Sequence, residues 1–335
     1  MEPLIEICKH RYGKQMTYTE QTDGVHYEDS YPWIRSLLKE RGLKAGIFAS
    51  LGDLKNRKIF EVKEDVENGI FGVDVYSSLV PSVFDKVMHR HRRISESEWK
   101  DFYDYQIMPA YFSVFGKFPI AVSYAYGNDN FKKAVTQFLG GRNSGVGAGY
   151  SYDENVLNNS RPSTFRWYDE FVRGGYNADN QIDKMQGAIE GALHESGWIN
   201  NFTHWHNVVS DHREKDYEKY FDMLYEMNRK YDIHFCSYGE ALSYCAFRTM
   251  ITGTSILPCI DNQGRQHSIL KLEIDTKKER NPYLLQVPIS VKVGLKVGKQ
   301  VSCNYPLKQL SDKEVIIEVP YSSSPIIDIY TEQMK

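Results

Sequence analysis

The chain has 335 residues, of which 41% are hydrophobic and 25% charged, and its formal net charge at pH 7 is −3. This is the composition of an ordinary globular protein with room for one large domain and a small one. It argues against a dedicated nucleic-acid binder, because no long run of one charge sign occurs, and no stretch approaches the ~18 apolar residues of a membrane span.

The first two thirds of the sequence alternate between strand and helix patterns. Strands are expected at 14–19, 43–50, 70–76, 118–124, 197–206 and 233–236, and helices at 31–41, 95–115, 130–139, 183–196, 217–228 and 239–245. A polar turn is expected at 20–24, and 145–150 is expected as strand or loop. The polar segment 151–180 is expected as a long loop with one short helix. Strands that alternate with helices predict a parallel sheet.

The pattern changes near residue 248. Apolar and polar residues then alternate at 270–274 and 289–293, a third strand pattern covers 315–319, and turn signals separate the three. This predicts an all-β module of about 85 residues. We therefore expect two domains, a barrel-like α/β domain over 1–248 and a β-sandwich-like domain over 249–335. The small domain could bind glycans, mediate dimers or cover one end of the barrel.

Other features of the composition leave alternatives open. The five cysteines are scattered and odd in number, which predicts reduced thiols rather than a disulfide framework. The first ten residues are mixed and charged, so no signal peptide is visible and a cytoplasmic location is expected. The 24 tyrosines could line a sugar-binding cleft or simply build the core. Nothing selects an oligomeric state, and a homo-oligomer stays open.

Two histidines stand close together at the end of a predicted strand. His204 and His206 lie two residues apart, and on an extended segment they would point to the same side, with His212 nearby. Because a long amphipathic helix follows, the pair is expected at the carboxyl end of a strand, where barrel folds collect their chemistry. This clustering favours a hydrolytic or metal site.

Four short segments fall at or near the ends of predicted elements. They read MTYTEQTDG at 16–24, MHRHRRIS at 88–95, SYAYG at 123–127 and FTH at 202–204. Together with the order of the elements over roughly 10–248, they resemble the polysaccharide deacetylase family, also called the NodB-homology domain or carbohydrate esterase family 4. The resemblance implies a distorted (β/α) barrel with seven strands and a metal-dependent hydrolase that removes acetyl groups from a carbohydrate.

The resemblance also implies roles for particular residues. Asp23 matches a metal ligand, and His91 matches a second ligand, with His89 as a replacement for the missing third. Zinc is the metal expected with such ligands. His204 matches the catalytic acid, and His206 would face the same cleft and could take its place. Asp23, His204 and His206 therefore form the expected catalytic set.

Two positions depart from the family pattern. Thr22 stands where the family has its catalytic base, and Ser123 stands where it has an arginine. A carboxylate elsewhere could act as the base, and the candidates are Glu20, Asp74 and Asp153, although a solvated surface role is the plainer expectation for each. Arg161 could replace the arginine. These departures keep a second function open, a catalytically inactive carbohydrate-binding or assembly protein.

Plainer interpretations stand beside each site residue. Asp23 could be a turn residue before Gly24, His204 could be a buried histidine beside Trp205, and residues 88–93 could be an exposed basic stretch. A glycoside hydrolase on a related barrel is a third function, and it would need two carboxylates at catalytic separation.

Overall fold

The computed structural model describes residues 4–77, 82–85, 90–124, 137–143, 149–151, 163–279, 281–294, 299–311 and 313–333. The chain forms two compact units, one of Met16–Leu242 and one of Met1–Gln15 together with Ser243–Lys335. The expected boundary at 248 lies close to this division. The expectation placed the first fifteen residues in the barrel domain, whereas they belong to the unit that holds the C-terminal strands.

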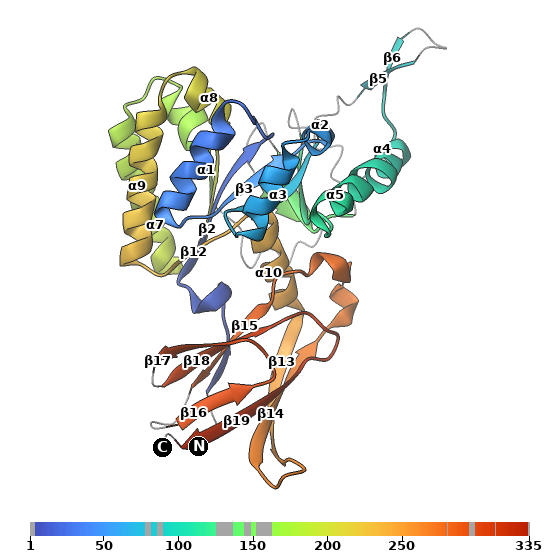
Figure 1. Ribbon diagram of the computed structural model, residues 1–335, viewed down its shortest axis with the longest axis vertical. Helices are drawn as coiled ribbons and strands as arrows, with labels where there is room; N and C mark the ends of the chain where they lie inside the picture. The colour runs from blue at the N-terminus through green and yellow to red at the C-terminus, as the bar shows by residue number, and fades with distance from the viewer. Residues whose placement is uncertain are drawn as a thin grey trace. The chain divides into compact units, whose positions relative to one another are not determined.

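The larger unit is built on a curled parallel sheet (Figure 1). Seven parallel strands run in the order β10–β11–β2–β3–β4–β7–β8, which gives the expected distorted (β/α) barrel. Their bounds are Ser163–Phe165, Trp198–Phe202, Met16–Asp23, Ala45–Ala49, Phe71–Ser77, Ala121–Tyr124 and Gly140–Asn143. β9 (Gly149–Ser151) adds an antiparallel edge to β8, and β12 (Ile233–Phe235) pairs in parallel with β2.

Helices follow most of these strands. They are α1 (Ser30–Arg41), α2 (Leu51–Lys55), α3 (Ile59–Glu67), α4 (Glu96–Phe102), η2 (Tyr103–Ile107), α5 (Met108–Phe115), η5 (Trp167–Val172), α7 (Ala178–Glu195), α8 (Trp205–Ser210), α9 (Glu214–Lys230) and α10 (Tyr238–Met250). Two sequence signals act as expected. Gly42 ends α1 in the left-handed conformation at φ 60°, and Ser95 with Glu98 forms a capping box at α4.

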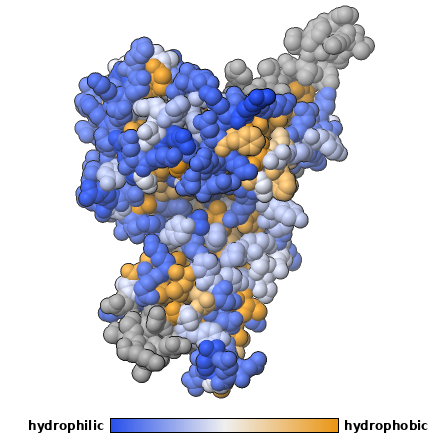
Figure 2. All heavy atoms as spheres, viewed as in Figure 1, coloured by the Kyte–Doolittle hydropathy of each residue, from blue (hydrophilic) through white to orange (hydrophobic). Residues whose placement is uncertain are grey.

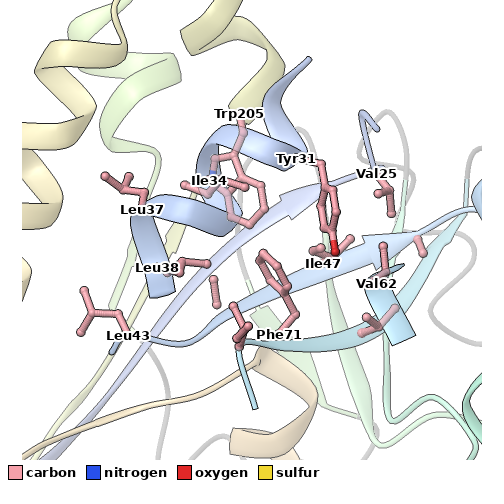
Figure 3. Packing of buried hydrophobic residues seen from close by; sticks show 14 of the residues in the cluster. Val25, Tyr31, Ile34, Leu37, Leu38, Leu43, Ile47, Val62, Phe71 and Trp205 are labelled. Carbon is pink, nitrogen blue, oxygen red and sulfur yellow. The ribbon is translucent and has the colours of Figure 1, made fainter. Parts of the chain in front are cut away.

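The core of this unit lies between the sheet and its helices. Figure 3 shows Ile34 and Leu38 of α1 packed with Ile47 of β3, Phe71 of β4 and Trp205. The largest aromatic side chains, Trp99 and Trp167 among them, are fully buried, so much of the aromatic content builds the core. In Figure 2 the visible outer surface over α7 and α9 is mostly hydrophilic.

The smaller unit contains two four-stranded antiparallel sheets, as expected for a sandwich-like module. One has the order β1–β15–β18–β17, with bounds Ile5–Ile7, Ile289–Gly294, Glu314–Val319 and Leu307–Ser311. The other has the order β13–β14–β19–β16, with bounds Ile251–Ile260, Gln266–Ile274, Ile326–Gln333 and Lys299–Cys303. Short 3₁₀ turns stand at Arg11–Gly13, Thr276–Lys278 and Pro282–Leu284.

Two expected segments near the site are wrong. Residues 20–23 continue strand β2 rather than forming a turn, because their polar side chains find buried partners on neighbouring strands. The strand expected at 197–206 ends at Phe202, and His206 lies in helix α8. The short strands β8 and β10 were not expected. Residues 130–136 of an expected helix lie outside the described residues.

A β5–β6 hairpin (Ser82–Asp85 and Arg90–Arg93) precedes α4. Across the part of the chain that the structure describes, no helix has both the length and the apolar character needed to cross a bilayer.

Candidate functional site

The strand ends that carry the first and last motifs are direct neighbours in the sheet. β2 and β11 pair in parallel, with Phe202 opposite Gln21. Beyond the end of β11, the Thr203 amide donates to the Gln21 carbonyl at 2.9 Å, and the Trp205 amide donates to Thr22 Oγ1 at 3.4 Å. The two motifs therefore meet at the carboxyl edge of the sheet, where parallel α/β folds place their sites.

Asp23 forms a buried ion pair at this edge. It ends β2, its side chain is 3% exposed, and Gly24 follows with φ 77°, a conformation that favours glycine. Its Oδ1 accepts a hydrogen bond from Nη2 of Arg142, a fully buried residue of β8, at 2.5 Å. Burial lowers the pKa of Arg142, and attraction to Asp23 opposes that effect. Asp23 is therefore no solvated turn residue.

Three residues besides Asp23 contact the guanidinium of Arg142. Its Nε donates to Gln21 Oε1 at 3.3 Å. Its Cζ lies 3.7 Å from the centre of the Phe202 ring and 4.6 Å from that of Phe48. Stacking between two rings holds a guanidinium in place and compensates in part for its lost hydration.

His204 forms a hydrogen-bonded pair with an acidic residue. It stands directly before the first residue of α8, and its Nδ1 lies 3.2 Å from Oδ1 of Asp169 in η5. The His204 amide donates to Asp169 Oδ2 at 2.9 Å, and the Asn207 amide group donates to Oδ1 at 2.8 Å. Burial acts to raise the pKa of Asp169, but these bonds and the nearby imidazole outweigh it and lower the pKa. Asp169 is thus favoured as a carboxylate, which only accepts hydrogen bonds.

The imidazole of His204 is consequently oriented. Since the carboxylate of Asp169 only accepts, Nδ1 must carry the proton, which leaves Nε2 for chemistry. The His204 side chain is 25% exposed, while that of Asp169 is 5% exposed. A buried carboxylate behind a partly exposed imidazole is a common arrangement for moving a proton.

Two further histidines extend this group. The His206 ring centre lies 5.5 Å from that of His204 and 4.0 Å from that of His26, which follows the Asp23–Gly24 turn. Burial, followed by repulsion from His26 and His204, lowers the pKa of His206 to about 4. Burial also lowers the pKa of His26. His206 is therefore a neutral imidazole near pH 7.

The expected catalytic residues form one continuous group of contacts. Asp23 bonds Arg142, whose guanidinium stacks on Phe202, and the Phe202 ring lies 4.6 Å from that of His204. The ring centre of His206 lies 5.5 Å from that of His204. The structure thus brings Asp23, His204 and His206 to one edge of the sheet, although His206 arrives on a helix and not on the expected strand.

Two of the carboxylates proposed as replacement bases, Glu20 and Asp74, are buried, so the solvated role expected for these two is wrong. Glu20 is 1% exposed, and its carboxylate accepts from Asn201, from Tyr217 at 2.7 Å and from Tyr220 at 3.2 Å. Burial raises the pKa of Glu20 to about 7. The arrangement suits a fixed carboxyl inside a tyrosine cage, on the opposite face of β2 from Asp23.

Asp74 is the second of these carboxylates. It is 3% exposed and accepts from the backbone amides of Ile120, Ala121 and Gly239, at 2.9 to 3.0 Å. Burial raises the pKa of Asp74 to about 6. These bonds tie β4 to β7 and to the start of α10, so Asp74 acts as a clamp within the barrel.

Other expected site residues lie outside the described residues. These are His89, Asp153 and Arg161. His91 belongs to strand β6, but only its backbone is described. Ser123 is fully buried on β7 and pairs in register with Arg142 on β8, so an arginine does reach this region from the next strand.

Of the three ligands that the resemblance implies, only Asp23 has a described side chain, so the fit of a metal is tested at this carboxylate. No group of three or more His, Cys, Asp or Glu side chains able to hold a metal ion occurs among the residues described. The positive observation is that a guanidinium already occupies Asp23 Oδ1. Two unit charges 4 Å apart repel by about 4 kcal/mol at an effective dielectric constant near 20, and a dication would double this cost. The reaction proposed for this site therefore uses only side chains of the protein.

Sequence reasoning missed three residues of this site. His26 lies three residues after Asp23, close enough to have been noticed. Asp169 falls in the polar segment 151–180, which was expected to be a long loop with one short helix. Arg142 follows Gly140 and Gly141 in a segment without a strand pattern, so only the sheet order shows that it reaches Asp23.

Comparisons with known proteins found distant structural similarities. No family model matches the chain, and no curated protein matches it. Puue allantoinase has a similar structure, with TM-score 0.47, 9% identity, and coverage of 70% of this chain and 91% of that one. A Mycobacterium smegmatis protein assigned as a polysaccharide deacetylase gives TM-score 0.45, 10% identity, and coverage of 74% and 95%.

A third similar structure is a family 4 acetyl xylan esterase from Clostridium thermocellum in complex with a cobalt ion. It has TM-score 0.40, 8% identity, and coverage of 68% of this chain and 90% of that one. At such low identity these likenesses say nothing about activity, and the barrel assignment above rests on the strand order.

Proposed function

We propose that this protein is a deacetylase-like hydrolase that removes an acyl group from a carbohydrate, with His204 as the residue that transfers the proton. The observation that carries this proposal is the bond between His204 and the buried Asp169 at the carboxyl edge of β2 and β11. The carbohydrate comes from the resemblance of the motifs at 16–24 and 202–204. It does not come from the aromatic content, much of which lies in the core.

His204 would act as the acid. Asp169 fixes the ring through its bond to Nδ1, and Nε2 would donate a proton to the leaving nitrogen or oxygen as the acyl bond breaks. General acid–base catalysis of this kind contributes about 10²–10⁴-fold to a rate. The neighbouring phenyl ring of Phe202 would limit the approach of water from one side.

His206 would act as the proton acceptor in place of the carboxylate that Thr22 lacks. It is neutral near pH 7, so a ring nitrogen can accept a hydrogen bond from the water that attacks the acyl carbon and take its proton as that bond forms. Its pKa of about 4 makes it a weaker base than an ordinary imidazole. The water oxygen forms the new bond to carbon, the bond to the sugar nitrogen or oxygen breaks, and the proton of His204 goes to that atom. The products are the free acid and the deacylated sugar. Two histidines whose environments differ are a recurring basis for such a division of roles.

The zinc expected with Asp23, His89 and His91 is not part of this proposal. Asp23 is already neutralised by Arg142, and the side chains of the other two lie outside the described residues.

A second function is favoured by a specific observation. Thr22 bonds a backbone amide instead of offering a carboxylate, and Asp23 is engaged by Arg142. Both facts suit a protein that has kept the barrel and lost the reaction. In that case the protein binds a carbohydrate without hydrolysing it.

One experiment separates the two functions. The purified full chain is incubated with N-acetylated and O-acetylated sugar oligomers, acetate release is measured, and binding is measured by calorimetry. The first proposal predicts acetate release that falls about 10²–10⁴-fold in His204→Gln and clearly in Asp169→Asn. His194→Gln, at an exposed position near the end of α7, serves as the control and should keep full activity.

The outcomes are distinct. Binding of the oligomers without acetate release supports the inactive protein. Release that is unchanged in His204→Gln refutes the role given to His204. If the oligomers are neither bound nor deacetylated, both functions are refuted.

A further inference from the structure

The pair of Asp23 and Arg142 differs from an ordinary surface ion pair in its surroundings. Arg142 is fully buried, and its guanidinium lies between the rings of Phe202 and Phe48. Its Nε is engaged by Gln21, as described above. The cation therefore has a fixed position on the carboxylate and cannot swing into solvent without breaking this packing.

The charges at this place are already balanced. One carboxylate faces one guanidinium, so a dication bound to Asp23 would lie close to the positive charge of Arg142 and be repelled by it. The two other buried carboxyls of β2 and β4 are engaged elsewhere, Glu20 by its tyrosine cage and Asp74 by three backbone amides. Thr22, next to Asp23, carries no charge. Asp169, a third buried carboxylate at this edge, is engaged by His204 and Asn207. Each of these three described carboxylates therefore already has other partners than a metal ion on Asp23.

The remaining polar atoms of the pair suit a neutral group. Asp23 Oδ2, an acceptor, and Arg142 Nη1, a donor, are both buried without a hydrogen-bond partner among the described residues. A hydroxyl or a water molecule can donate to the first and accept from the second, whereas a cation satisfies only the first.

From these observations we infer that Arg142 takes the place of the metal ion at this site. Its guanidinium is the permanent cation on Asp23, and the protein binds no divalent metal through that carboxylate. The inference concerns the same edge of the sheet as the proposed function, but it does not depend on catalysis. It holds for an active enzyme and for an inactive binding protein.

The first test measures metal directly. The full chain is stripped with EDTA and titrated with ZnCl₂ in a calorimeter, and the double variant Asp23→Leu with Arg142→Met is treated in the same way. The expected result is the same zinc stoichiometry in both proteins. One equivalent of zinc that the original chain binds and the double variant loses would overturn the inference.

The second test measures coupling between the two residues. Asp23→Leu and Arg142→Met each leave one buried charge unpaired, so each should lower Tm by at least roughly 6 °C. The double variant removes both charges and should lose much less than the sum, as in other buried pairs replaced by apolar residues. The exposed pair of Asp179 and Lys219 is the control, and Asp179→Asn with Lys219→Met should give additive and small shifts.

The results leave no neutral outcome. Single variants that fail to fold beside a double variant that folds support the inference, because they show the same coupling in a stronger form. Additive losses, or a double variant that does not fold, overturn it. Neither test uses acetate release, so a failure of the proposed reaction is distinguishable from a failure of this inference.

Discussion

Glu20 gives the sharpest prediction about the stability of the barrel. Burial raises its pKa from 4.5 to about 7, because the carboxylate has lost its hydration inside the tyrosine cage. The folded state therefore binds a proton more tightly than the unfolded state does. Below pH 4.5 the group is protonated in both states and has no effect. As pH rises toward about 7, the folded chain bears a growing cost, which is constant above that pH.

The size of this cost follows from the two pKa values. One pKa unit corresponds to about 1.4 kcal/mol, so the difference between 4.5 and about 7 corresponds to roughly 3 kcal/mol. Glu20→Gln should remove the cost. The Gln oxygen can accept from Asn201 and Tyr217, and its amide can donate to the hydroxyl of Tyr220. The amide also replaces the oxygen that accepts the 2.8 Å bond from Asn201, and the loss of that bond offsets part of the gain. The variant should be more stable than the original chain at pH 8 by up to about 3 kcal/mol, or roughly 6–12 °C in Tm.

The assay is thermal unfolding of both proteins from pH 4.5 to 8. The difference in Tm between them should grow across this range, and the original chain should lose the stability. Glu240→Gln is the control of opposite sign. Lys44 bonds Glu240 at 2.6 Å, and this attraction outweighs burial and lowers the pKa of Glu240. That variant should therefore lose stability by an amount that stays nearly constant from pH 4.5 to 8, because Glu240 is ionised in the folded and unfolded states over most of this range. A constant difference between Glu20→Gln and the original chain would refute the reasoning.

Three further predictions test packing and electrostatics. Gly72→Ala would place a Cβ 2.3 Å from Ser237 Oγ and should lower stability by about 1–3 kcal/mol, whereas Gly187→Ala, with open space in α7, should raise it by about 0.5–1 kcal/mol in denaturant unfolding. His206 should titrate with a pKa of about 4 in the NMR spectrum of its ring protons, and a midpoint near 6.5 would contradict the buried, neutral imidazole. Asp65→Ala should lower the free energy of unfolding by about 3–5 kcal/mol, because Arg35 and Tyr31 both lose the buried carboxylate that they bond. A loss below about 1 kcal/mol would show that these bonds are unimportant.

Much of the barrel was predictable because its signals are local. The helix that ends at Gly42, the capping box of Ser95 and the apolar strands β3 and β4 depend on residues a few positions apart. The same holds for the alternating strands β14 and β15 of the smaller unit. The place of the first fifteen residues was not predictable, because β1 pairs with β15 across almost the whole chain.

The candidate site was likewise predictable only in part. The sequence by itself pointed to Asp23, His204 and His206, since a motif is a local pattern of side chains that can be read at the end of a strand. Only the tertiary structure decided what these residues contact. Arg142 meets Asp23 from 119 positions away, and Asp169 meets His204 from 35 positions away, because parallel strands bring their carboxyl ends to one edge. Whether a carboxylate can hold a metal depends on which charge faces it in space, and spacing along a chain does not contain that information.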